Sequence, residues 1–373
     1  MTAPHDEGTD RALRFWLGLS LLLLLIERLP GPLGGWSISA FGYVGAAEPV
    51  IFLLGASIAA PLVRVYAEAG AAQGALRSLH RSWQLYWRYL GAILISGALS
   101  ALLIGGDRAT ALAGLDLSPL AADPATTLFE IASFQFLPAF FAVAGVYVAI
   151  LALSVPLIGL ARLNLYWGLA CVAAAYLAAQ FGVGFPGWTL NPLAWALLFM
   201  AGVAFGAGWI KTPEVTPGAG LDRRFFAATA ILAIALAVAP SAVLGGAWRG
   251  AATPLGWEAE ATLGPVRLLH FAALAYFALV ATASLQRRNI FATGAAREIA
   301  TLGAQALVTL VALHPVAALA QALARPSLGA PFLGPVLAIL VAVAAVALLF
   351  LCVATARWFD DPPWGKPAPK PRG

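Results

Sequence analysis

The sequence predicts an all-α protein built as a bundle of membrane-spanning helices. Hydrophobic residues make up 61% of the 373 residues, charged residues only 10%, and the mean hydropathy is +0.86. Soluble domains carry about 25% charged residues, so this composition indicates that most of the chain is embedded in a bilayer. Apolar runs such as 336–350 are unbroken and lack the alternation of barrel strands, which favours helices over a β-barrel.

About ten segments have the roughly 20 apolar residues that a helix needs to cross the hydrocarbon core. In chain order they are expected at 12–30, 46–66, 83–104, 135–157, 163–183, 191–210, 224–246, 265–286, 299–323 and 334–356. The third is the least certain in type, because Trp83, Trp87 and Arg88 also suit an interfacial segment. The first apolar stretch follows an acidic segment with no basic leader, so we expect it to remain as a helix.

These spans predict one polytopic membrane domain over 12–357, flanked by two tails. The N-terminal tail is 1–11, and the C-terminal tail, 358–373, is rich in proline and lysine and is predicted to be disordered. Alternating the spans from a cytoplasmic N-terminus places 17 of the 22 Lys and Arg residues on the cytoplasmic side. Because cytoplasmic loops are rich in Lys and Arg, both termini are expected in the cytoplasm.

The composition also argues against several kinds of partner. A net charge of +5 would suggest nucleic acid in a soluble protein, but here the basic residues are expected to set orientation, so no nucleic-acid partner is predicted. Cys171 and Cys352 lie far apart in apolar runs, and the four histidines lack ligand spacing. Neither a disulfide framework nor a metal site is predicted. The expected partner is the lipid bilayer, and the sequence does not fix the oligomeric state.

Polar or ionisable side chains in the apolar spans are costly, so each is a candidate site residue. They are Glu27, Arg28, Glu48, Arg267, His270, Gln305 and His314. The first five lie at the outer ends of three predicted helices, and they are therefore predicted to line a polar cavity that faces outward. Structural roles stay open, since Arg28 at a helix end can snorkel to lipid headgroups and Glu48 in a first turn complements the helix dipole.

The two longest outer loops are predicted at 105–133 and 244–265, and they contain the acidic residues Asp107, Asp116, Asp123, Glu130, Glu258 and Glu260. Long loops in a compact membrane domain are often functional. A purely connecting role remains the alternative for both.

Four stretches resemble motifs of a known family. They are the first helix from Asp10-Arg11 to Pro30-Gly31, the acidic segment GAAEPVIFLLG at 45–55, GWTLNPLAW at 187–195 and LGPVRLLHF at 263–271. On these motifs the chain resembles the OpgC branch of the acyltransferase family 3 superfamily, integral membrane acyltransferases whose members succinylate osmoregulated periplasmic glucans. Segment 302–307 looks like a worn copy of the family's GRQSL signature.

The resemblance implies a multi-pass protein of the bacterial inner membrane that acts on a periplasmic glucan or another envelope carbohydrate. The acyl donor would be of the acyl-CoA type and would bind as a substrate, so no tightly bound cofactor is implied. The family position of the catalytic histidine is Arg28 here, the preceding asparagine is Glu27, and the arginine eleven residues earlier is Leu17. Arginine stays protonated at physiological pH and cannot serve as a general base.

A substitute mechanism is conceivable with the residues that still match the family. The expected catalytic residues are His270 as base and Glu48 orienting it, with the positive charge of Arg28 or Arg267 holding the oxyanion. The expected binding residues are Arg28, Glu27, Asn191, Trp188 and Arg267.

Three classes of function stay open from the sequence. The first is an O-acyltransferase, and the second is an inactive member of the same family that binds a glycan or a protein partner. The third is a transporter, for which paired broken helices and internal repeats are expected; we see no clear repeat of that kind in the sequence.

Overall fold

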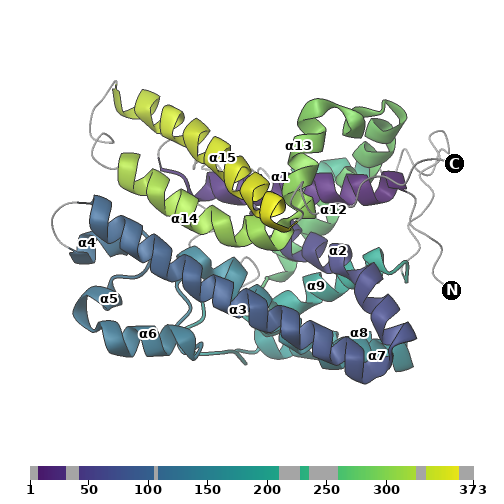
Figure 1. Cartoon of the computed structure of the whole chain (residues 1–373). Coiled ribbons are helices and arrows are strands. Elements are labelled where there is room, and N and C mark those ends of the chain that lie inside the picture. The colour runs from purple at the N-terminus through teal and green to yellow at the C-terminus, as the bar shows by residue number, and fades with distance from the viewer. Residues whose placement is uncertain are drawn as a thin grey trace, which may run out of the picture.

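The computed structural model describes residues 7–30, 42–104, 108–209, 227–234, 259–324 and 333–360 (Figure 1). Within these ranges the ordered elements are helices, and the only β-type pairing is an isolated bridge between Leu137 and Trp188. The predicted all-α class is confirmed.

Six helices of the described chain are long and apolar enough to cross a membrane. They are α2 (Ala47–Glu68), α3 (Gly70–Leu103), α7 (Ala142–Leu163) with the 3-10 turn η3 (Ala139–Phe141) before it, α12 (Pro265–Arg287), α14 (Ala306–Ala324) and α15 (Leu333–Asp360). On α15 the side chains of Leu340 and Val343 are 59% and 62% exposed, as suits a helix covered by lipid. The chain is therefore a membrane protein, and these six helices correspond to six of the predicted spans.

Three other predicted spans appear as helices that do not meet the same criteria. α1 (Glu7–Arg28) has 22 residues but carries charged side chains at both ends, whereas α8 (Leu165–Gln180) and α9 (Pro192–Gly206) have only 16 and 15 residues. A helix of that length is shorter than the hydrocarbon core. For the span predicted at 224–246, only 227–234 lies within the described residues, and this piece is helical.

The span predicted at 299–323 is confirmed over 306–324, but its predicted start at 299 is wrong. The structure has two helices there, α13 (Gly294–Ala304) and α14, and Gln305 lies between them. Thr309 accommodates the break, because its hydroxyl donates to the carbonyl of Leu302 at 2.8 Å.

The predicted outer loop at 105–133 contains three short helices. They are α4 (Arg108–Ala113), α5 (Pro119–Ala122) and α6 (Pro124–Ala132). Asp123 caps α6 by accepting a hydrogen bond from the backbone N–H of Thr126 at 3.2 Å. The side chain and backbone of Thr126 lower the pKa of this exposed carboxyl. The other long loop, at 244–265, is described only from 259 onward.

The C-terminal helix is longer than predicted. α15 continues to Asp360, whereas the disordered tail was predicted to begin at 358. The rest of that tail, 361–373, lies outside the described residues.

Two helix pairs approach so closely that only glycine fits between them. At the crossing of α1 and α13, a methyl group added to Gly303 would lie 1.9 Å from the carbonyl oxygen of Arg14. At the crossing of α2 and α9, one added to Gly202 would lie 1.9 Å from the carbonyl oxygen of Phe52. Small residues at helix contacts allow this backbone approach, which is typical of membrane bundles. Each crossing therefore fixes the position of one helix against its partner, α1 against α13 and α2 against α9.

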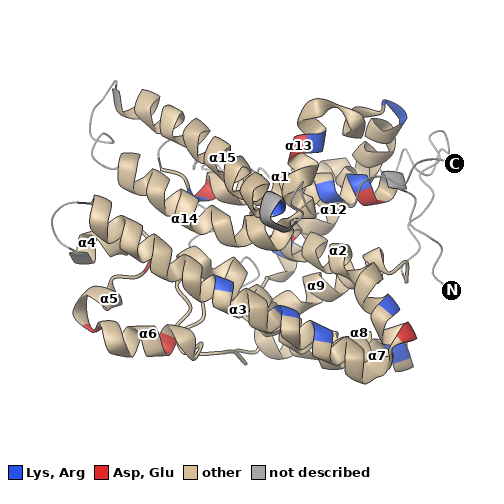
Figure 2. Cartoon of the chain, viewed as in Figure 1, with Lys and Arg blue, Asp and Glu red and all other residues tan. Residues whose placement is uncertain are grey.

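Charged residues are distributed unevenly over the bundle. Figure 2 shows Lys and Arg mainly on the half that contains the start of α1, while α4, α5 and α6 lie toward the opposite end.

Candidate functional site

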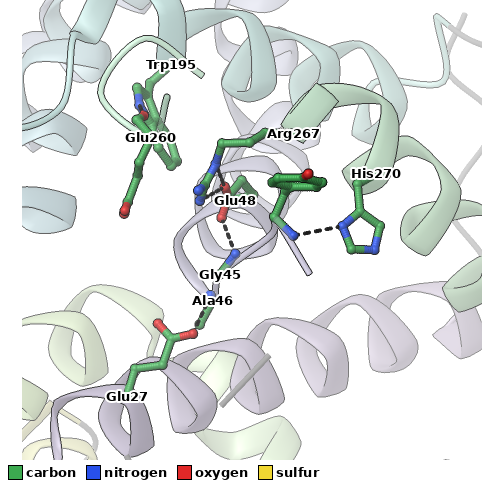
Figure 3. A network of polar contacts seen from close by, with 9 residues as sticks. Glu27, Gly45, Ala46, Glu48, Trp195, Glu260, Arg267 and His270 are labelled. Carbon is green, nitrogen blue, oxygen red and sulfur yellow. Dashed lines mark hydrogen bonds and ion pairs between the residues drawn. The ribbon is translucent and has the colours of Figure 1, made fainter. Parts of the chain in front are cut away.

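The candidate site lies around the turn 43–46, which leads into α2. Four ionisable side chains from three helices meet there, Glu27 of α1, Glu48 of α2, and Arg267 and His270 of α12 (Figure 3). We call these four residues the polar cluster. Backbone N–H groups of the turn bind three of the four side chains, so the turn is the common element that holds them together.

Glu48 forms a buried ion pair with Arg267. The carboxylate is fully buried and lies in the first turn of α2, and Nε of Arg267 donates to its Oε1 at 2.8 Å. Nη2 of Arg267 also donates to Oε1, and the backbone N–H of Gly45 donates to Oε2 at 2.9 Å. Both oxygens therefore have partners, as a charge buried in a membrane domain requires. Glu48 therefore does more than complement the dipole of α2, which was the structural alternative.

Glu27 reaches the same turn from the end of α1. The backbone N–H of Ala46 donates to its Oε1 at 3.0 Å. A methyl group added to Gly45 would lie 3.6 Å from Oε1 of Glu27 and 3.6 Å from Oε2 of Glu48. The two carboxylates thus approach Gly45 together, at ordinary van der Waals distance from such a methyl group.

His270 follows Arg267 by one turn of α12, and only 1% of it is exposed. Its Nδ1 accepts a hydrogen bond from the backbone N–H of Tyr43 at 3.3 Å. An accepting Nδ1 carries no proton, so in the neutral ring the proton is on Nε2. Glu48 was expected to orient the imidazole of His270. Its hydrogen bonds go to Arg267 and Gly45 instead, and the imidazole is held by Tyr43.

The segment before α12 is fixed by hydrogen bonds from two other helices. On α8, Tyr176 donates to the carbonyl of Leu263 at 3.1 Å and Gln180 to that of Thr262 at 2.6 Å. At the start of α9, the backbone N–H of Asn191 donates to the carbonyl of Ala261 at 2.8 Å, and the indole of Trp195 donates to that of Glu260 at 3.2 Å. These bonds set where α12 begins, and hence where Arg267 and His270 lie.

Arg28 is next to Glu27 in sequence but belongs to a different set of contacts. Its guanidinium lies over the ring of Phe140, 5.3 Å from the centroid, and Gln321 of α14 donates to its backbone carbonyl at 2.8 Å. The imidazole of His314 stacks on Phe141, with 5.0 Å between ring centroids. Arg28 therefore packs inward against aromatic rings, and the alternative of snorkelling toward headgroups does not describe it.

The two remaining predicted binding residues hold backbone segments in place. Asn191 caps α9, because its Oδ1 accepts from the N–H of Leu193 at 3.1 Å and its Nδ2 donates to the carbonyl of Val183 at 2.7 Å. The indole N–H of Trp188 donates to the carbonyl of Phe134 at 2.6 Å, and its ring packs beside Phe134. Trp188 is therefore part of an aromatic contact with the segment before α7, apart from the polar cluster.

Some residues of the site were missed in the sequence. Gln321 is a polar side chain in an apolar helix, and that contrast was the signal that could have found it. The backbone N–H groups of Tyr43, Gly45 and Ala46 carry no such signal. Among the described residues no group of three or more His, Cys, Asp or Glu could hold a metal ion.

A protein-family model described as "OpgC protein" matches residues 10–361. Comparison with curated proteins and with solved structures gave no match. The matched residues include every helix that contributes to the polar cluster. The chain therefore belongs to the OpgC protein family.

Proposed function

We propose that this membrane protein transfers an acyl group, such as succinyl, from an acyl-CoA-type donor to a hydroxyl of a periplasmic glucan or another envelope carbohydrate. The bacterial inner membrane would be its location. The observation that carries the proposal is the convergence of the polar cluster on turn 43–46, within a chain that the OpgC family model matches over 10–361. No tightly bound cofactor is needed for this transfer.

In the proposed reaction the acceptor hydroxyl attacks the thioester carbonyl, the carbon–sulfur bond breaks, and the thiolate leaves. A base must take the hydroxyl proton. Glu48 is engaged by Arg267 and is not available as a base. His270, the histidine of the polar cluster, is therefore the proposed base. Because its Nδ1 accepts from Tyr43, substrate binding must open that bond before the ring can take up a proton. The positive charge of Arg28 or Arg267 would stabilise the oxyanion.

A cellular assay tests the transfer. The protein would be expressed in a strain that lacks glucan substitution, and the succinyl content of the periplasmic glucans would be measured. We expect the wild-type chain to restore substitution and His270→Ala to abolish it. His80→Ala is the matched control, because His80 is an exposed histidine of α3 whose ring hydrogen-bonds to Gln84 on the same helix. Unchanged substitution with His270→Ala would contradict the role of His270.

A second candidate is a family member that binds a glycan without transferring an acyl group. Two observations favour it, namely Arg28 at the family position of the catalytic histidine and the engagement of Glu48 by Arg267. In that case the wild-type chain leaves the glucans unsubstituted, while the purified protein still retains a periplasmic glucan. Retention that His270→Ala does not change would identify binding without catalysis.

A further inference from the structure

A second charged region lies at the other end of α1. An open cavity of about 1000 Å³ is formed between α1, α13 and α15. Its charged lining residues are Asp10, Arg11, Arg14, Arg297, Glu298 and Arg357. Figure 2 shows basic residues where these three helices come together. We call this region the arginine cavity, and none of its lining residues belongs to the polar cluster.

The arginines of this cavity are available to a ligand. The one ion pair within the described residues is that of Glu48 with Arg267, so no guanidinium of the cavity is neutralised by a described carboxylate. Among the described residues, the one side-chain hydrogen bond of the four cavity arginines is from Nη2 of Arg297 to the carbonyl of Ala292 at 3.2 Å. Four arginines and two acidic residues leave a formal charge of +2, since 4 − 2 = 2.

From this arrangement we infer that the arginine cavity binds a phosphate-bearing ligand. Guanidinium groups present paired N–H donors that match phosphate oxygens, and several around one anion give strong charge-assisted bonds. A formal charge of +2 complements a phosphate dianion. The volume is within the range of small-molecule sites, and it is larger than a single inorganic phosphate needs.

Close packing of α1 against α13 fixes the position of Arg14 relative to Arg297. Arg14 lies one turn before Gly18, and a methyl group on Gly18 would lie 1.9 Å from the carbonyl oxygen of Ile299. Ile299 follows Arg297 and Glu298 on α13, so the tight crossing lies directly beside the cavity. Binding groups on helices held this closely need little reordering, and this preorganisation favours affinity.

The phosphate has two chemical sources, a soluble phosphate ester and the headgroup of an anionic phospholipid. The full-length protein would be purified in neutral detergent, and its thermal unfolding would be followed with increasing pyrophosphate or ADP. In a second arm the protein would be placed in nanodiscs of phosphatidylcholine with or without phosphatidic acid. Sodium chloride at matched ionic strength controls for screening, because bound ligand raises the unfolding temperature in a saturable way.

We expect saturable stabilisation in at least one arm, and the arm that responds identifies the source. Arg14→Gln and Arg297→Gln should each weaken the apparent Kd about tenfold, the loss expected for one charge-assisted hydrogen bond. Arg77→Gln and Arg88→Gln, exposed on α3 outside the cavity, should leave the Kd unchanged. Size-exclusion profiles of all variants would confirm that they fold.

Three results would overturn the inference. They are no stabilisation in either arm, stabilisation that sodium chloride reproduces, and a Kd that the cavity variants leave unchanged. In the last two cases the arginines act only as general positive charge beside the membrane. The inference does not depend on acyl transfer, because the readout is ligand binding alone.

Discussion

The two ends of α1 carry charge in opposite ways. In the polar cluster Glu48 is fully buried, and each of its oxygens has a partner. In the arginine cavity the charged side chains are exposed, and none is in an ion pair with a described residue. Buried charge needs a fixed partner, whereas exposed charge is solvated and stays free to bind. The first region is therefore built to hold a geometry, and the second is built to receive an anion.

The largest expected effect tests the buried side of this contrast. Arg267→Ala removes the partner of Glu48 and leaves a carboxylate buried without a counter-charge. Breaking a buried pair from one side costs about 3–5 kcal/mol. Thermal unfolding in detergent, with the yield of folded protein, measures this loss. Arg77→Ala on the exposed face of α3 is the control, and a similar stability for both variants would contradict the account of the pair.

The next effect concerns the glycine crossing beside the arginine cavity. In Gly303→Ala the new methyl would lie 1.9 Å from the carbonyl oxygen of Arg14, so α1 and α13 must move apart. Overpacking of this kind costs about 1–3 kcal/mol. Gly91→Ala in α3 is the control, because a methyl there meets nothing within 4 Å and helical alanine is favoured over glycine. Equal unfolding temperatures for the two variants would rule out a tight crossing.

The sequence predicts the fold class because hydropathy is an average over many residues. Long apolar helices such as α2 and α12 appear within two residues of their predicted bounds. The break between α13 and α14 is confined to one residue, Gln305, and the length rule does not respond to a feature of that size. The length rule also began the third span at 83, where Trp83 and Arg88 look interfacial, although α3 already begins at Gly70.

The sequence predicted which residues form the polar cluster, but it did not predict which of them contact one another. The ionisable residues Glu27, Glu48, Arg267 and His270 stand out in apolar helices, so burial cost identifies them. Their partners depend on how α12 and turn 43–46 are placed, which only tertiary structure decides. The arginine cavity escaped notice for a related reason, because its residues come from both ends of the chain.

A smaller effect tests the exposed side of the contrast. Arg357→Gln without added phosphate should change the free energy of unfolding by no more than about 0.5 kcal/mol, as for surface substitutions with no ion pair. The same variant should lose stabilisation by the phosphate probe that responds. A loss of several kcal/mol without phosphate would show that Arg357 has a structural role, and the contrast between the two ends of α1 would fail.

The smallest expected effect is a pH-dependent stabilisation of the start of α6 by Asp123. This carboxyl is exposed and is held by hydrogen bonds, so it lies between the two cases compared above. The pKa of Asp123 is lowered by its hydrogen bonds with Thr126, so the charged form is the one that favours the folded start of α6. This contribution is present above the unfolded pKa of about 3.9 and is lost as pH falls through the lower folded value. Asp123→Ala should therefore speed amide hydrogen exchange in 124–132 at neutral pH, measured by mass spectrometry after correction for intrinsic rates. The difference between variant and wild type should shrink at acidic pH, and a difference that stays constant with pH would mean that charge on Asp123 does not stabilise α6.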